Sequence, residues 1–135
     1  MTVVIDTNVL LVAVARSSSL HTIFRKLVAQ QFDLAISTEI FLEYEEIFQR
    51  KFGEGATNEI LNLLRNLPNV QRTETYYYWQ IIAQDPDDNK FIDCAVAANA
   101  TYIISNDAHF RILKRTKFPP LKLLTGEEFV KLLED

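Results

Sequence analysis

The chain has 135 residues, of which 48% are hydrophobic, so we expect one compact domain over residues 1–135 with a core of its own. Its formal net charge of -4 excludes a protein that binds nucleic acid through a large basic surface, although a local basic rim stays compatible with such a substrate. The single cysteine, Cys94, excludes an internal disulfide, and we expect it to be a small core residue.

The amino-terminal stretch is apolar, but it lacks the basic residues that open a signal peptide, and Asp6 and Asn8 interrupt it. No apolar run in the sequence reaches the length of a membrane span. We therefore expect a cytoplasmic protein.

Strands and helices are predicted to alternate along the chain. Apolar and β-branched runs predict strands at residues 2–5, 32–37, 101–105 and 121–125, with one or two further short strands within 69–84. Helices are predicted after the first strand and at residues 20–30, 38–51, 57–67, 91–100, 108–115 and 126–135. A loop containing Gly53 and Gly55 is predicted at 52–56. The alternation predicts an α/β fold with a parallel sheet and helices on both faces.

Hydroxyl side chains are predicted to cap three of these helices at their amino-terminal ends. The candidates are Ser17 to Ser19 for the second helix, Ser37 or Thr38 for the helix that follows the second strand, and Thr57 for the next one.

Two acidic residues directly follow predicted strands. Asp6 comes after the first strand, and Asp107 comes after the strand at 101–105. Ligands of an open parallel sheet bind outside the carboxyl ends of its strands, which makes both residues candidates for a binding site. Each also precedes a helical segment, so helix capping is the alternative interpretation.

The glutamate-rich helix after the second strand carries one acid beside its apolar face. Its apolar positions recur at helical spacing and are Ile40, Tyr44, Ile47 and Phe48. At roughly 100° per residue, Glu43 lies at the border of this face. Glu39 and Glu46 lie further out, and Glu45 points away from the core. A solvated acidic face is the alternative interpretation for Glu43.

The stretch DPDDNKF concentrates negative charge just before a helix with a wide apolar arc. A helical wheel places Asp88 within that arc, whereas Asp93 lies on the polar side near Lys90. Asp85 and Asp87 are predicted turn residues. Asp88 is therefore the acid expected to point inward, and favourable charge at a helix amino terminus is the structural alternative.

The candidate acids Asp6, Glu43, Asp88 and Asp107 are predicted to converge, and their mutual repulsion would raise some of their pKa values unless a cation neutralises them. Two histidines and a lone cysteine disfavour zinc. Oxygen ligands suit Mg²⁺ or Mn²⁺, which bind phosphates readily. Such clusters serve phosphodiester cleavage, in which the metal activates water and stabilises the leaving oxygen.

The chain resembles the PIN-domain family, and within it the bacterial VapC-like toxins. The resemblance covers nearly the whole chain and rests on four segments in order: VVIDTNVLL, STEIFLEYEEIF, DPDDNKFIDCAVAANATYIISND and LLTGEEFVKLL. It implies a three-layer α/β/α sandwich with a central, mostly parallel sheet. It also implies a ribonuclease that depends on Mg²⁺ or Mn²⁺, that forms a homodimer, and that an antitoxin partner often covers at its active site.

The resemblance assigns roles to individual residues. The acidic quartet of the family falls on Asp6, Glu43, Asp88 and Asp107, as catalytic residues and metal ligands. Asn8, Ser105 and Asn106 match supporting polar positions, with Asn8 orienting ligands. Asp93 matches a candidate fifth acid, although the helical wheel argues against it.

Two further features have both a functional and a structural interpretation. Arg111, Lys114 and Arg115, with Lys117, form a basic stretch that is a candidate RNA contact, or else a solvated helix face. The aromatic run at residues 76–79 is expected to be core or dimer contact, with base stacking as the alternative. His109 is close enough to Asp107 in sequence to touch a substrate, without being assigned as a general base.

The leading hypothesis is a Mg²⁺- or Mn²⁺-dependent endoribonuclease that acts as the toxin of a toxin–antitoxin pair. The alternatives are a PIN-type nuclease in RNA processing and a PIN fold that binds RNA or a partner without cutting. A receiver domain with an acidic pocket is disfavoured, because the second strand ends in Ser37 and Thr38 rather than in a phosphoacceptor Asp.

Overall fold

The structure is a computed structural model that describes residues 1–82, 86–117 and 119–135. Five strands lie within these ranges: β1 (Thr2–Ile5), β2 (Asp33–Ile36), β3 (Val70–Arg72), β4 (Tyr102–Ile104) and β5 (Lys122–Leu124). The α-helices are α1 (Thr7–Ala13), α2 (His21–Val28), α3 (Thr38–Asn66), α4 (Asn89–Ala97) and α5 (Gly126–Glu134). Two 3₁₀ helices are η1 (Pro86–Asp88) and η2 (Ala108–Lys114).

The strands form one sheet in the order β3-β2-β1-β4-β5, and every neighbouring pair is parallel. The chain builds outward from β1 to β3 and then returns to the other side of β1 with β4. The strand order therefore reverses between β1 and β4, which is where ligands bind in sheets of this kind.

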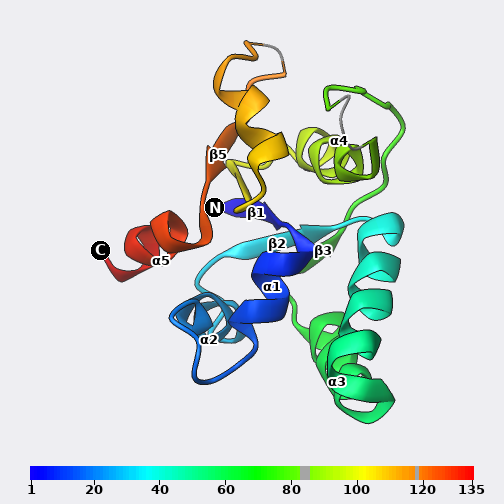
Figure 1. Cartoon of the computed structure of the whole chain (residues 1–135), viewed down its shortest axis with the longest axis vertical. Helices are drawn as coiled ribbons and strands as arrows, with labels where there is room; N and C mark the ends of the chain where they lie inside the picture. Colours follow the sequence, from blue (N-terminus) through cyan, green and yellow to red (C-terminus); the bar gives the residue numbers. More distant parts are fainter. Residues whose placement is uncertain (83–85, 118) are drawn as a thin grey trace.

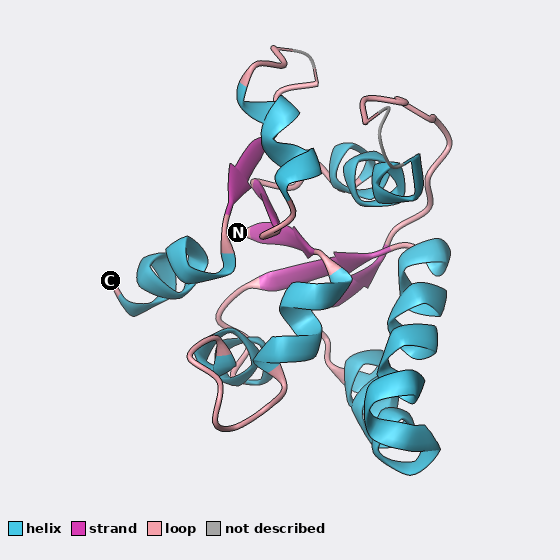
Figure 2. Cartoon of the chain, in the orientation of Figure 1, coloured by secondary structure: helices cyan, strands magenta, loops and turns pink. Residues whose placement is uncertain are grey.

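Helices cover both faces of the sheet, which confirms the predicted α/β/α sandwich (Figure 1). Helices α1, α2 and α5 lie on one side, where α2 contacts both α1 and α5. Helix α4 packs on β1, β2 and β4 from the other side. The central strands β1, β2 and β4 consist mostly of buried apolar residues because both faces of the sheet are covered there, whereas the edge strands β3 and β5 are half-buried or exposed. The colouring by element in Figure 2 shows the strands enclosed between the helical layers.

Helix α3 differs from the prediction of two helices separated by a loop. It runs from Thr38 to Asn66, and the break is confined to Gly53, which has φ 81° and ψ 172°. Only glycine adopts this region without strain, so one residue replaces the predicted loop. Thr57 therefore caps no helix; it is buried inside α3.

The kink gives a matched pair of glycine substitutions. Gly53→Ala is expected to lower the free energy of unfolding by about 1–3 kcal/mol, because alanine is strained at this backbone conformation. No atom lies within 4 Å of an added Cβ at either Gly53 or Gly55, so a clash plays no part. Gly55→Ala, at ordinary helical φ, is expected to stabilise by up to about 1 kcal/mol. Urea unfolding compares the two, and equal effects would contradict the assignment of the kink to Gly53.

The other predicted caps have mixed outcomes. Ser37 caps α3, since its hydroxyl accepts from the Ile40 amide at 3.2 Å. Thr125, which was not predicted as a cap, forms a capping box with Glu128 at the start of α5. The serines before α2 are not caps: Leu20 occupies the cap position, and the Ser18 hydroxyl accepts from its amide at 3.0 Å, which forms a turn instead.

The segment after β3 carries an unexpected surface. Tyr76, Tyr77 and Tyr78 are 84%, 66% and 63% exposed, so these three are not core residues, and the dimer contact that was the other expectation stays a prediction. Only Trp79 of the run packs against the core. The segment has no regular secondary structure, and the three tyrosine side chains lie at the surface. Cys94, by contrast, is fully buried as expected, and burial raises the pKa of its thiol to about 12.

None of the helices in the described part of the chain is both long enough and apolar enough to cross a membrane.

Candidate active site

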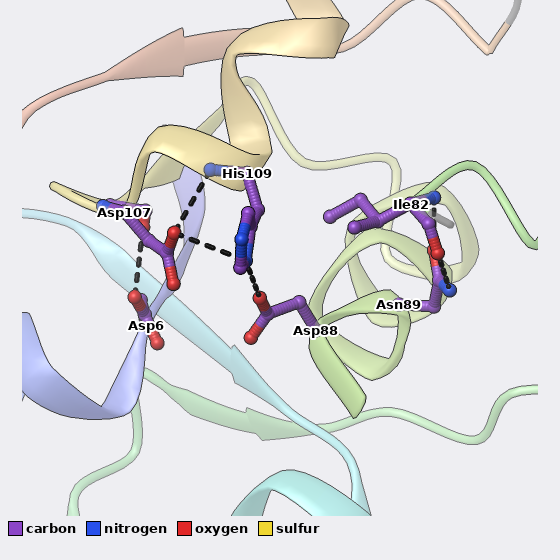
Figure 3. Close-up of polar contacts among 7 residues, drawn as sticks. Asp6, Ile82, Asp88, Asn89, Asp107 and His109 are labelled. Carbon is purple, nitrogen blue, oxygen red and sulfur yellow. Dashed lines mark hydrogen bonds and ion pairs between the residues drawn. The ribbon is translucent and has the colours of Figure 1, made fainter. Parts of the chain in front are cut away.

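Acidic residues gather at the carboxyl end of β1 and β4, where the strand order reverses. Asp6 follows β1 directly, and Ser105 and Asp107 follow β4. The two chain segments are held side by side, since the Asp6 amide donates to the Ile104 carbonyl at 2.9 Å. Figure 3 shows Asp6, Asp107, His109 and Asp88 pointing toward one another from these elements and from the start of α4.

Asp6 is the most deeply buried of the acids, with 5% of its surface exposed. Its Oδ2 accepts from the Ser105 hydroxyl at 2.8 Å, and it caps α1 with no side-chain hydrogen bond. The pKa of Asp6 is raised to about 6: burial raises it most, the Ser105 hydrogen bond lowers it, and the carboxylates of Asp88, Glu43 and Asp107 raise it. The helix-cap interpretation therefore does not account for this side chain.

Asp107 and Ser105 form a turn that presents both side chains to the same place. The Ser105 hydroxyl, which donates to Asp6, accepts from the Asp107 amide at 3.0 Å. Asp107 Oδ1 caps η2 by accepting from the His109 amide at 2.9 Å. Asp107 therefore has the capping contact that the sequence allowed, and it also faces the other acids.

Glu43 reaches the site from α3. The neighbouring Tyr44 is fully buried and donates its hydroxyl to the Ile5 carbonyl at 2.5 Å, which fixes this part of α3 against the end of β1. Glu43 Oε2 accepts from the Thr7 hydroxyl, and its Oε1 pairs with Lys90 Nζ at 2.8 Å. Glu43 is therefore tied to α1 and α4 rather than being part of a solvated acidic face.

Asp88 lies in η1, at the position that precedes α4, and makes no side-chain cap hydrogen bond. Its Oδ2 is 3.3 Å from His109 Nδ1, which is also 3.4 Å from Asp107 Oδ1. One ligand atom from each of Asp88, Asp107 and His109 lies within 4.8 Å of the others, a spacing that could hold a metal ion. His109 thus bridges two acids that come from separate elements.

Asp93 does not lie on the polar side of α4, so that prediction was wrong. It is 5% exposed, and its Oδ1 accepts from the Trp79 amide at 2.9 Å. Asn89, one turn earlier, accepts from the Ile82 amide at 2.8 Å and donates to its carbonyl at 2.9 Å (Figure 3). These side chains hold the preceding segment on α4. Lys90 pairs with Glu43 and makes no ion pair with Asp93 among the described residues. Burial also raises the pKa of Asp93.

The other predicted residues occupy the rim of the site. A cleft of about 380 Å³ is lined by Asp6, Asn8, Asn106, Asp107 and Glu127, among others. Asn8 is exposed in the first turn of α1. Asn106 accepts from the Gly126 amide at 2.9 Å, so it joins the β4 loop to α5.

The basic candidates begin one turn beyond the acids. Arg111 and Lys114 are exposed on η2, and Arg115 follows it. Of the acidic stretch before α4, Asp87 lies in η1 and is exposed, whereas Asp85 falls outside the described residues.

Thr7, Lys90 and His109 were not chosen as site residues from the sequence. Each contacts a candidate acid through a side chain that comes from another element or another turn. The position of Thr7 directly after Asp6, and of His109 two residues after Asp107, was the only sequence signal available.

The chemistry of the donors suits a hard divalent cation. Asp88, Asp107 and His109 place two carboxylate oxygens and one nitrogen at metal-ligand spacing, whereas Asp6 and Glu43 are not part of that closely spaced group and are linked to it by charge. Three carboxylates raise the pKa of the buried Asp6, so a cation would relieve an electrostatic cost that is already present. Mg²⁺ and Mn²⁺ prefer such oxygen-rich sites.

Comparison with known proteins gives one family and one fold. The family model of the PIN domain matches residues 2–109. No curated protein matches the chain. The fold is similar to a chain in the crystal structure of VapBC2 from Rickettsia felis bound to a DNA fragment from their promoter, with a TM-score of 0.64 and 18% identity over 93% of this chain and 98% of that chain.

Proposed function

The chain belongs to the PIN-domain family, and we propose that it is a metal-dependent endoribonuclease, the toxin of a toxin–antitoxin pair that acts in the cytoplasm. The observation that carries the proposal is the coupling of acids from four separate elements at the switch point of the sheet. Asp6 is desolvated there, and the pKa of its carboxyl rises further because of Glu43, Asp88 and Asp107. A protein gains nothing in stability from such a cluster, so we attribute it to function.

In this proposal Asp6, Glu43, Asp88 and Asp107 hold Mg²⁺ or Mn²⁺ directly or through water. When bound, the metal supplies an activated water and stabilises charge on the scissile phosphate of RNA. Ser105 orients Asp6 by its hydrogen bond at 2.8 Å. Thr7 and Lys90 orient Glu43.

His109 has a proposed positioning role. It lies between Asp88 and Asp107 at 3.3 Å and 3.4 Å, with 40% of its side chain exposed. A protonated imidazole would hold the two carboxylates together by charge, and a neutral one would donate to one of them. Either state keeps Asp88 aligned with the β4 loop.

The partners follow from the same proposal. A toxin requires an antitoxin, and the similar VapBC2 chain comes from a structure of a complex with promoter DNA. The exposed Arg111, Lys114 and Arg115 on and after η2 would contact RNA phosphates beside the acids. We also propose a single domain and a homodimer.

The test is RNA cleavage by the purified chain with Mn²⁺ or Mg²⁺ and with EDTA. We expect internal cleavage of single-stranded RNA with either metal and none with the chelator. Expression alone is expected to arrest growth, and co-expression of the neighbouring gene is expected to relieve the arrest. Cleavage without growth arrest would favour RNA processing, whereas metal binding without cleavage would favour a binding protein on the same fold.

A further inference from the structure

A second groove lies at the carboxyl edge of the sheet, between strands β2 and β3 and the two halves of α3. It has a volume of about 400 Å³ and is lined by the end of β2, the first turns of α3, β3 and the last turns of α3. Its lining residues are Ile36, Ser37, Thr38, Phe41, Leu64, Arg65, Val70 and Arg72.

The kink of α3 creates this groove. Phe41 and Arg65 are 24 positions apart, so an unbroken helix would separate them by about 36 Å. The reversal at Gly53 instead brings the Arg65 guanidinium to 4.8 Å from the centre of the Phe41 ring. The first and last turns of one helix therefore form two walls of the same groove.

The charge of the groove is opposite to that of the rest of the protein. Two arginines, Arg65 and Arg72, line it, and the described lining includes no acid. The chain as a whole has a net charge of -4. Two clefts elsewhere in the described chain are each lined by three acids, which are Glu39, Asp87 and Asp93 in one and Asp6, Asp107 and Glu127 in the other. Among the described residues, neither arginine has a carboxylate within ion-pair distance. Their hydrogen bonds go to Asn62 and Thr38.

The arginines are also held in fixed orientations. Arg65 lies over the Phe41 ring and donates to Asn62 Oδ1 at 3.1 Å, while Arg72 donates to Thr38 Oγ1 at 3.3 Å. Both remain exposed at the surface. A guanidinium that lies over an aromatic ring can present its other face to a base and its N–H groups to phosphate. The apolar floor of Ile36, Leu64 and Val70 suits a base as well.

We propose that this groove binds a nucleotide of the RNA strand outside the cleavage site; the inference rests on the proposed function. The groove and the acids lie at the same edge of the sheet, because Ser37 follows β2 and Asp6 follows the adjacent parallel strand β1. Strand β3 lies two strand spacings from β1, about 10 Å.

The experiment measures RNA affinity apart from cleavage. An Asp6→Asn background in EDTA prevents cutting, and fluorescence anisotropy reports the binding of a short fluorescein-labelled single-stranded RNA. Adding Arg65→Ala and Arg72→Ala together is expected to weaken binding by about tenfold and to reduce the salt dependence of binding, with a change in slope of about 0.7 per lost phosphate contact. Arg65→Lys keeps the charge without the planar group, so its RNA affinity is expected to lie between that of the Asp6→Asn background and that of the double variant.

The matched control is Arg50→Ala. Arg50 lies on the same helix, is 70% exposed and pairs with Glu46 at 2.7 Å, outside the groove. It is expected to leave RNA affinity unchanged. If the double variant binds RNA as tightly as this control does, the proposal is overturned. That result would also be obtained if the groove binds an acidic peptide instead of RNA. Circular dichroism and urea unfolding confirm that the variants fold.

The two proposals fail separately. Metal-dependent cleavage by the wild type together with full RNA affinity in the double variant overturns the groove and leaves the nuclease standing. If the wild type cleaves no RNA and the double variant still loses RNA affinity, the groove is supported and the nuclease is overturned.

Discussion

Asp6→Asn is expected to lower metal-dependent RNA cleavage by at least about 100-fold. Loss of a group that only orients a metal ligand costs about 10- to 100-fold in affinity or activity, so loss of a ligand carboxylate costs no less. The amide keeps an oxygen for the Ser105 hydroxyl, which donates to Asp6 at 2.8 Å, so the local structure is expected to survive. Initial rates at saturating Mn²⁺ provide the measurement, and full activity in the variant would remove Asp6 from the site.

The same substitution is expected to stabilise the metal-free protein. The pKa of Asp6 is about 6 in the folded chain against 3.8 for an ordinary Asp, so the folded state binds more protons between these values. The free energy of unfolding therefore decreases as the pH rises from about 4 to 6, and the deficit remains at pH 7. Removing the charge recovers about 2–3 kcal/mol at pH 7, and little at pH 4, where Asp6 is already protonated in the fold.

Asp107→Asn is the control that separates function from stability. It is expected to abolish cleavage as well, but its side chain is 34% exposed, so removing its charge is not expected to stabilise the fold as Asp6→Asn does. Chemical denaturation in EDTA at pH 4 and pH 7 measures both variants. An Asp6→Asn variant that is inactive and destabilised at pH 7 would indicate a structural role for the carboxylate.

Much of the site's location could be predicted because it depends on strand ends and helix periodicity. Asp6 and Asp107 follow strands directly, and parallel strands end at one edge of the sheet, so their proximity required no knowledge of long-range contacts. Glu43 was distinguished from its neighbours by the border of an apolar face, which the burial of Tyr44 defines. The fold class followed from the alternation of strands and helices in the same way.

The errors came from contacts that a single element does not reveal. The helical wheel of α4 treated Asp93 as solvated, because the segment that ends at Ile82 and folds over it is not part of the helix. Lys90 is three residues before Asp93 in sequence, but its partner is Glu43 on α3. The region around Gly53 was predicted as a loop because glycine usually marks one, whereas a single residue of unusual φ and ψ turns the helix.

Asp88→Asn is expected to weaken Mn²⁺ binding by at least about tenfold, whereas Asp93→Asn is expected to leave it unchanged. The two acids are five residues apart and differ in their surroundings. Asp88 faces His109 and the β4 loop at the switch point, whereas Asp93 accepts from the Trp79 amide and packs under the segment before α4. Asparagine keeps an acceptor oxygen at position 93, so that hydrogen bond is expected to survive.

Isothermal titration calorimetry of Mn²⁺ into the wild type and both variants, at equal protein concentration, measures the difference. Weaker binding in Asp88→Asn alone would explain the negative charge before a buried helix, because Asp88 would then be a metal ligand. Asp93 would have the separate role of binding the Trp79 amide and so fixing the segment before α4. Equal binding in all three proteins would remove Asp88 from the metal site and leave it as a charge at a helix amino terminus. Loss in both variants would place Asp93 in the metal site and would contradict its buried, hydrogen-bonded position in the fold.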